Sequence, residues 1–185
     1  MTFQFKIIVF IVVSIGLAWV SRSSLCDFRS HGFYRFFAWE SLLALILLNL
    51  DYWFYEPFSP HQILSWLLLI VSLFLVIHGF LLLRWVGKPD SKRNDASLVG
   101  IEKTTELVTV GAYRYIRHPL YSSFLYGSWG VFLKHPSWAG AFLAVITTFF
   151  ATMTAKIEEA ENVHFFGAAY QSYMKQTKMF IPFFF

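Results

Sequence analysis

Long apolar runs with almost no charge constrain this chain more than any other feature. Of its 185 residues, 57% are hydrophobic and only 14% are charged, against about 25% charged residues in an average soluble domain. A run of about 20 apolar residues is long enough to cross the hydrocarbon core of a bilayer. Within lipid, a helix satisfies its own backbone hydrogen bonds. The composition therefore predicts an all-α integral membrane protein that passes the lipid bilayer several times.

The apolar runs define the predicted architecture, a polytopic transmembrane helical bundle of about five spans. The candidate spans are residues 1–20, 36–50, 63–86, 120–133 and 137–155. After the last span the helical pattern continues through residues 156–164, and Gly167 is placed to end that helix. We divide the chain into residues 1–86, with three spans, and residues 87–185, with two spans and the C-terminal helical segment.

The charges of the connectors predict the orientation of the chain. Connectors 21–35 and 87–118 carry an excess of Lys and Arg, whereas connector 51–62 carries two acids and no base. Because cytoplasmic loops are enriched in basic residues, the first two are predicted in the cytoplasm and the third outside. The N-terminus then lies outside, and the chain from Lys156 onward lies in the cytoplasm. Lys134 falls on an outer turn, against the rule.

Other classes of function are disfavoured by the same composition. The net charge is +4, but the basic residues flank apolar segments instead of forming one patch, so no nucleic-acid partner is predicted. Cys26 is the only cysteine, which leaves no internal disulfide and no cysteine-rich metal site. No obligatory protein partner is evident.

One polar stretch, residues 111–123, stands out against the apolar background. Polar and ionisable side chains precede the apolar run directly: Tyr113, Arg114, Tyr115, Arg117 and His118. Proline disfavours helical geometry in the residue before it, so His118 is predicted to be extended, with Pro119 in the first turn of a helix. A cation, an imidazole and free helix N–H groups suit a carboxylate or phosphate ligand. The same residues are also typical of membrane-flanking charges and an aromatic belt.

A second polar cluster follows the fifth span. On a helix, Glu158, Glu161 and Asn162 share one face, while Glu159 points elsewhere. Alone, this pattern is typical of a solvated helix end. A helical hairpin joins it to the first cluster, so the two clusters are predicted to be neighbours. Acid on one wall and base on the other would suit a ligand with both an amino and a carboxylate group.

The two clusters together resemble a known family. The sequence Tyr-Arg-Tyr-Ile-Arg-His-Pro-Leu-Tyr at 113–121, Glu158-Glu159, Phe166-Gly167 and the tyrosines at 170 and 173 look like the isoprenylcysteine carboxyl methyltransferase and phospholipid methyltransferase family. The resemblance covers residues 104–182. It implies a multi-pass S-adenosylmethionine-dependent methyltransferase whose active site faces the cytoplasm. Residues 87–185 would be the methyltransferase core, with the C-terminal helices as a cytoplasmic cap over the cofactor.

The resemblance also implies roles for individual residues. His118 and Arg117 would be catalytic, and the cofactor would be bound by Tyr113, His118, Pro119, Leu120, Tyr121, Glu158 and Glu159. The acceptor would be lipophilic or amphipathic: a phospholipid amine, an isoprenylcysteine carboxylate or a thiol. Methyl transfer from a sulfonium needs alignment of the reactants and exclusion of water, so no metal is predicted. An amine acceptor must lose a proton, for which His118 is the candidate base.

Several residues fit this reading less directly. The family usually has an arginine where this chain has Met179, with Lys178 beside it, and lysine does not reproduce bidentate arginine geometry. Glu40 lies inside the second candidate span, where an acid is costly and is a functional candidate by default. It supports the competing class, a small membrane transporter or a non-catalytic membrane subunit. His78 is either packed against other helices or directed toward the same cavity.

Overall fold

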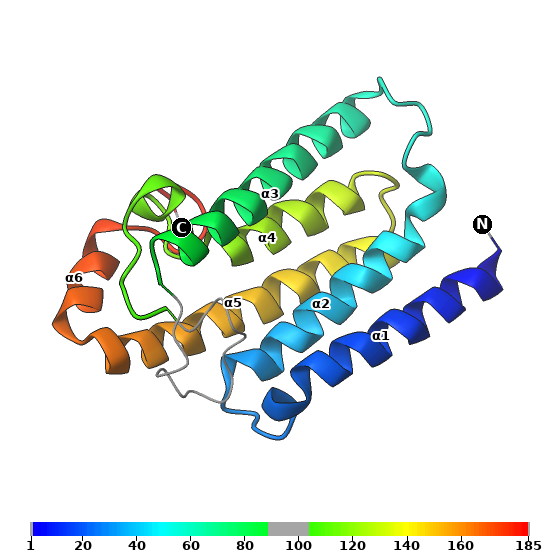
Figure 1. Ribbon diagram of the computed structural model, residues 1–185. Coiled ribbons are helices and arrows are strands. Elements are labelled where there is room, and N and C mark those ends of the chain that lie inside the picture. The colour runs from blue at the N-terminus through cyan, green and yellow to red at the C-terminus, as the bar shows by residue number, and fades with distance from the viewer. Residues whose placement is uncertain (1, 89–103, 185) are drawn as a thin grey trace.

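The structure is a bundle of helices that alternate in direction, with a short helix across one end (Figure 1). The computed structural model describes residues 2–88 and 104–184. The α-helices within these residues are α1 (Phe3–Leu25), α2 (His31–Leu48), α3 (Pro60–Trp85), α4 (Pro119–Phe132), α5 (Trp138–Phe166) and α6 (Ala168–Gln176). Two 3-10 turns, η1 (Leu50–Tyr52) and η3 (Gly111–Arg114), lie between them. No strand is assigned in the described ranges, and the predicted all-α class is confirmed.

Three helices, α1, α3 and α5, are long and apolar enough to cross a membrane. They make the chain a membrane protein. Helix α4 has 14 residues and is therefore about 21 Å long, shorter than the hydrocarbon core of about 30 Å. Helix α2 has 18 residues and includes Arg35 and Glu40. The prediction of five spans is therefore not confirmed, although helices α1 to α5 all run along the bundle and alternate in direction (Figure 1).

Local sequence signals explain where the helices begin and end. Helix α2 starts five residues before the predicted span because Ser30 caps it, with its hydroxyl accepting the Phe33 N–H. Proline occupies the first turn of α3 and of α4, as predicted for Pro119. Helix α5 runs without a break to Phe166, and Gly167 ends it with a φ of 59°. Glycine reaches that left-handed conformation without strain, and the predicted end of this helix is confirmed.

Polar side chains tie the helices together inside the bundle. Helix α5 packs most extensively on α2, and α4 on α3. Hydroxyl groups bridge both pairs. Between α3 and α4, Ser65 donates to the Gly130 carbonyl at 2.7 Å and Ser72 donates to the Ser123 carbonyl at 2.8 Å. Between α5 and α2, the Thr147 hydroxyl donates to the Ser41 hydroxyl at 2.9 Å. Such interhelical hydrogen bonds and the small residues beside them are typical of membrane helix packing.

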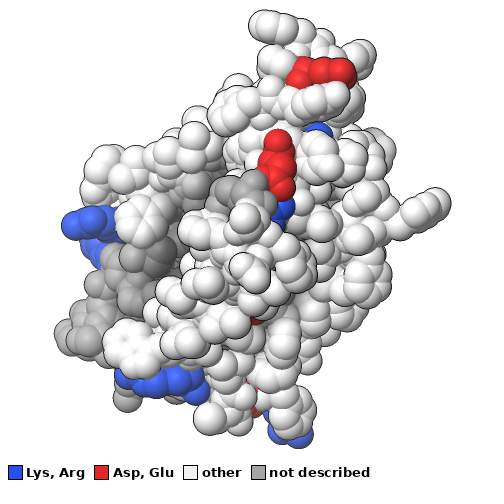
Figure 2. Space-filling model, turned by 90° about the vertical axis from the view of Figure 1, so that its right-hand side faces the viewer, with Lys and Arg blue, Asp and Glu red and all other residues white. Residues whose placement is uncertain are grey.

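Lys134, the one charge that breaks the orientation rule, is buried at the end of the bundle opposite the C-terminus. Lys134 is only 2% exposed. Its Nζ donates to Gln62 Oε1 at 3.0 Å and lies 3.3 Å from the centre of the Trp66 ring. Burial lowers the pKa of Lys134 to about 8. The exposed charges at this end include acids, seen as two red patches in Figure 2, and one of them, Asp51, pairs with Lys6 at 2.7 Å.

Candidate functional site

Residues 115–118 are held in place by the segment that follows α6. Ile116 and Lys178 form a parallel β-bridge. In this bridge the Lys178 N–H donates to the Tyr115 carbonyl at 3.0 Å, and the Arg117 N–H donates to the Lys178 carbonyl at 2.8 Å. The His118 N–H donates to the Met179 carbonyl at 3.2 Å. Two segments about sixty residues apart in sequence therefore form one short wall at the start of α4.

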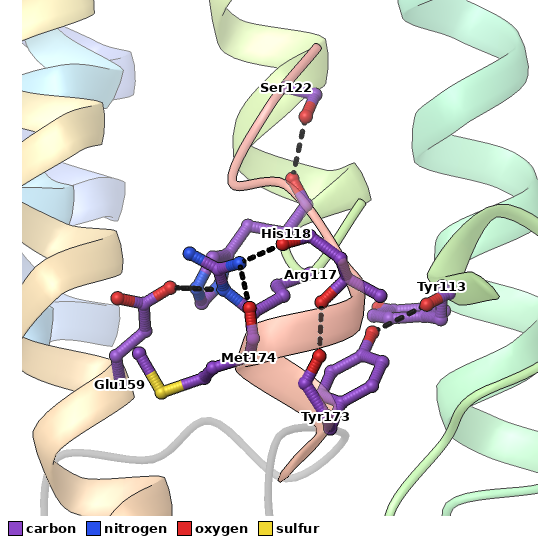
Figure 3. A network of polar contacts seen from close by, with 8 residues as sticks. Tyr113, Arg117, His118, Ser122, Glu159, Tyr173 and Met174 are labelled. Carbon is purple, nitrogen blue, oxygen red and sulfur yellow. Dashed lines mark hydrogen bonds and ion pairs between the residues drawn. The ribbon is translucent and has the colours of Figure 1, made fainter. Parts of the chain in front are cut away.

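Arg117 joins three elements through its guanidinium group (Figure 3). Its Nε donates to Glu159 Oε1 of α5 at 2.5 Å. Its Nη1 donates to the carbonyls of Met174 at 3.3 Å and Thr177 at 2.5 Å. The Arg117 and Glu159 side chains are each 10% exposed. A charge-assisted hydrogen bond in such a shielded place is strong, so this pair fixes the C-terminal segment against α5.

His118 is buried and oriented by the same carboxylate. Its ring is 3% exposed, and Nε2 lies 3.3 Å from Glu159 Oε1. An ionised carboxylate only accepts hydrogen bonds, so the hydrogen of this contact belongs to Nε2. The imidazole also stacks on Tyr121, with ring centres 5.5 Å apart. The predicted meeting of the basic and acidic clusters is present in the structure.

A pocket opens beside these residues, between the end of α3, the segment before α4, and helices α5 and α6. Six of the predicted site residues line it: Tyr113, Arg117, His118, Leu120, Tyr121 and Glu158. The other two do not. Pro119 lies in the first turn of α4, and Glu159 faces Arg117 and His118. The two adjacent glutamates thus have different surroundings: Glu158 lines the pocket, and Glu159 contacts Arg117 and His118.

Other pocket residues were quoted in the family motif or were missed. Phe166, Tyr170 and Tyr173 belong to the motif, and Asn162 was placed on the same helix face as Glu158, but no role was predicted for any of the four. Four were missed altogether: Leu83, Thr104, Leu107 and Val108. Apolar residues in a hydrophobic chain give no sequence signal that separates pocket from lipid.

The two motif tyrosines are neutral, buried parts of the pocket wall. Tyr170 is 3% exposed and Tyr173 is 7% exposed. Burial raises the pKa of both phenols above the ordinary value, and the nearby Glu158 carboxylate raises that of Tyr170 further. The Tyr173 hydroxyl donates to the Tyr113 carbonyl at 2.6 Å (Figure 3). This bond ties α6 to η3 on one side of the pocket.

The remaining candidates lie away from this pocket. Glu40 accepts a hydrogen bond from the Ser14 hydroxyl at 2.6 Å, in a groove between α1 and α2. His78 stacks on Phe74, with ring centres 5.2 Å apart, so it is a packed histidine and not a pocket residue. The Met179 side chain packs beside the cluster of Tyr121, Ala151, Ala155 and Phe180.

One polar pair links the first half of the chain to this region and was not predicted. His31 Nδ1 at the start of α2 lies 2.7 Å from Glu161 Oε2 of α5, and the His31 side chain is fully buried. Within the described residues, no group of three or more His, Cys, Asp or Glu side chains is arranged to hold a metal ion. The predicted polar loop at 87–109 lies largely outside the described residues.

Fold and site together define a membrane-embedded helical protein with a pocket of mixed charge at one end. A family profile described as phospholipid methyltransferase matches residues 61–169. Protein-S-isoprenylcysteine O-methyltransferase B of Arabidopsis thaliana is 34% identical over 145 residues, which cover 76% of this chain and 73% of that protein. The chain therefore belongs to the phospholipid methyltransferase family. This confirms the predicted family and the predicted enzyme class.

Two further relatives are also named as methyltransferases. Methanethiol S-methyltransferase of Crocosphaera subtropica is 32% identical over 133 residues, covering 70% of this chain and 46% of that protein. Human protein-S-isoprenylcysteine O-methyltransferase is 37% identical over 82 residues, covering 43% of this chain and 28% of that protein. The matched part is thus less than half of each of these two proteins. No solved structure matches the chain. None of these similarities supports the transporter alternative.

Proposed function

We propose that this protein transfers a methyl group from S-adenosylmethionine to a lipophilic or amphipathic acceptor, in an active site on the cytoplasmic side of the membrane. The acceptor is a phospholipid amine, an isoprenylcysteine carboxylate or a thiol. The relatives named for isoprenylcysteine and for methanethiol support an oxygen or sulfur nucleophile. Residues 87–185 form the catalytic part in this proposal, and residues 1–86 anchor it in the membrane.

The observation that carries the proposal is the pocket with an acid on one wall and two bases on the other. S-adenosylmethionine has an ammonium, a carboxylate and an aromatic base, and the lining residues match each group. Glu158 would bind the ammonium or the ribose. His118 and Arg117 would lie near the carboxylate, while Tyr121 and Leu120 would contact the adenine or the sulfonium. Leu83, Leu107 and Val108 provide apolar walls that exclude water.

The chain's own residues would mainly align the reactants and manage one proton. The cofactor supplies an activated methyl group on a sulfonium, which becomes a thioether as the new bond forms. Arg117 uses Nε and Nη1 on partners within the protein, and Nη2 has no acceptor among the described residues. Nη2 is therefore suited to an anionic oxygen of the acceptor or cofactor. His118 has its Nε2–H directed at Glu159, so Nδ1 is the nitrogen that would take a proton from an amine acceptor.

Calorimetry of the purified protein with S-adenosylhomocysteine, the demethylated product, tests the cofactor assignment. We expect saturable binding that His118→Ala and Glu158→Gln each weaken roughly ten- to a hundredfold, because each removes a hydrogen bond to a charged group of the ligand. Glu106→Gln is the matched control, since Glu106 is exposed and pairs with Lys88. No binding by the folded wild type would refute the assignment.

A labelling experiment then identifies the acceptor. The protein is incubated with lipid extract, isoprenylcysteine or a small thiol and with a methyl-labelled cofactor, and the products are weighed by mass spectrometry. Label is expected in one of these three classes. If cofactor binds but label enters none of them, the proposed acceptor class is wrong while the cofactor site stands.

A further inference from the structure

A second groove lies beside the pocket and has no part in the proposed reaction. It is lined by the segment before α4, by η3, and by α6 with the residues after it, and its polar lining is Thr109, Arg114, Ser172, Gln176 and Thr177. It shares Leu107 and Tyr173 with the pocket. The groove is therefore a neighbour of the pocket, and these two residues line both.

The groove contains an exposed cation, Arg114, that forms no ion pair within the described residues. Arg114 is exposed, and no carboxylate pairs with it among residues 2–88 and 104–184. The exposed acid Glu106 pairs with Lys88 at 2.7 Å. Thr109 and Ser172, with hydroxyl groups, and Gln176, with an amide, line the same groove as Arg114. A groove lined by a guanidinium and by hydroxyl and amide donors is suited to a phosphate group.

Exposed apolar and aromatic side chains lie in the segments that flank the groove. Tyr115 is 48% exposed and Phe183 is 82% exposed, and their ring centres lie 6.0 Å apart. Val110 and Phe184 are also exposed, by 47% and 86%. The Arg114 guanidinium lies 6.0 Å from the centre of the Tyr115 ring. Basic and aromatic residues at the end of spanning helices are typical of the membrane interface, where rings lie among headgroups and acyl chains.

We propose that this groove binds the phosphate of an anionic phospholipid headgroup, with Arg114 as its main contact and the acyl chains over Tyr115 and Phe183. A soluble phosphate would use the same cation but would leave these exposed rings uncovered. The lipid is a bound ligand in this assignment, distinct from the methyl acceptor in the neighbouring pocket.

Native mass spectrometry of the full chain released from nanodiscs tests the proposal. The discs contain equal parts of phosphatidylcholine and phosphatidylglycerol. We expect wild type to retain phosphatidylglycerol, Arg114→Gln to retain it about fivefold less, as for loss of one basic residue near a charged surface, and Arg114→Lys to retain most of it. Arg22→Gln is the matched control, because Arg22 is another exposed arginine at a helix end, and it should behave as wild type.

Three results would overturn the assignment. Equal retention by Arg114→Gln and wild type, with the same thermal stability, would show that the groove does not hold the headgroup. Equal losses in Arg114→Gln and Arg22→Gln would show unspecific attraction to positive charge. A third arm adds inorganic phosphate to the protein in phosphatidylcholine discs. If phosphate binds with the same dependence on Arg114 and displaces phosphatidylglycerol at similar concentration, the groove is a site for free phosphate.

Discussion

Changing each of the two adjacent glutamates of α5 to glutamine is expected to affect a different property of the protein. Glu159 holds Arg117 and His118 and is 8% exposed. Glu158 lines the pocket, is only half-buried, and has no ion-pair partner among the described residues. Glu159→Gln should therefore lower the stability of the fold, and Glu158→Gln should lower the affinity for the ligand.

The contacts of Glu159 set the size of the stability effect. Removing one partner of a buried ion pair costs about 3–5 kcal/mol, because the other charge stays buried without compensation. Arg117 keeps two carbonyl acceptors, from Met174 and Thr177, so we expect the lower end, about 3 kcal/mol. In a chain of this length, that corresponds to a fall of roughly 6–12 °C in the unfolding midpoint. Glu158→Gln should change stability by less than about 0.5 kcal/mol.

Both quantities can be measured on the same samples. Intrinsic fluorescence during heating gives the unfolding midpoint, and calorimetry below that temperature gives the affinity for S-adenosylhomocysteine. If Glu159→Gln keeps the wild-type midpoint but loses ligand affinity, Glu159 reaches the ligand directly and the division between the two acids is wrong. An equal fall in midpoint for both variants would contradict it as well.

Three further predictions concern other parts of the molecule. Gly111→Ala should destabilise the fold, because Gly111 has a φ of 59° and a Cβ there would lie 2.5 Å from His78 Nε2; His78→Ala in the same chain should recover part of the loss in thermal unfolding. The free energy of unfolding should rise with pH between about 8 and 10.5, because in this range Lys134 has lost its proton in the folded protein but keeps it in the unfolded chain. If a Lys134→Met variant shows the same rise in denaturant unfolding, this reasoning is wrong. Cysteines introduced at Ser59 and Gln176, with the native cysteine removed, should be labelled from outside and from the cytoplasm respectively; the reverse result would invert the topology, and labelling of both from one side would contradict it.

Much of the site could be predicted because its signals are local in sequence. Pro119 marks the start of α4, Gly167 marks the end of α5, and the α4–α5 hairpin returns the acidic cluster to the basic one. These features depend on backbone geometry and helix length, which a short stretch of sequence specifies. The predicted proximity of the basic and acidic clusters follows from them, whereas the particular pair of Arg117 and Glu159 was not predicted.

The features that could not be predicted depend on contacts between distant residues. His31 and Glu161 are 130 positions apart, and no spacing rule connects them. The burial of Lys134 requires Trp53, Trp66 and Gln62 to come from other parts of the chain. A charge count from the sequence treats this lysine as a surface charge, whereas in the structure its side chain is buried.

Helix α1 faces outward from the bundle over most of its length. None of its most apolar 18-residue window is buried, and the family match begins only at residue 61. Its 23 residues give about 35 Å of helix, slightly more than a bilayer core of about 30 Å. A small mismatch of this kind is accommodated by tilting the helix. The described lining of the pocket begins at Leu83, so the length of α1 can follow the thickness of the host membrane without changing a residue of that lining.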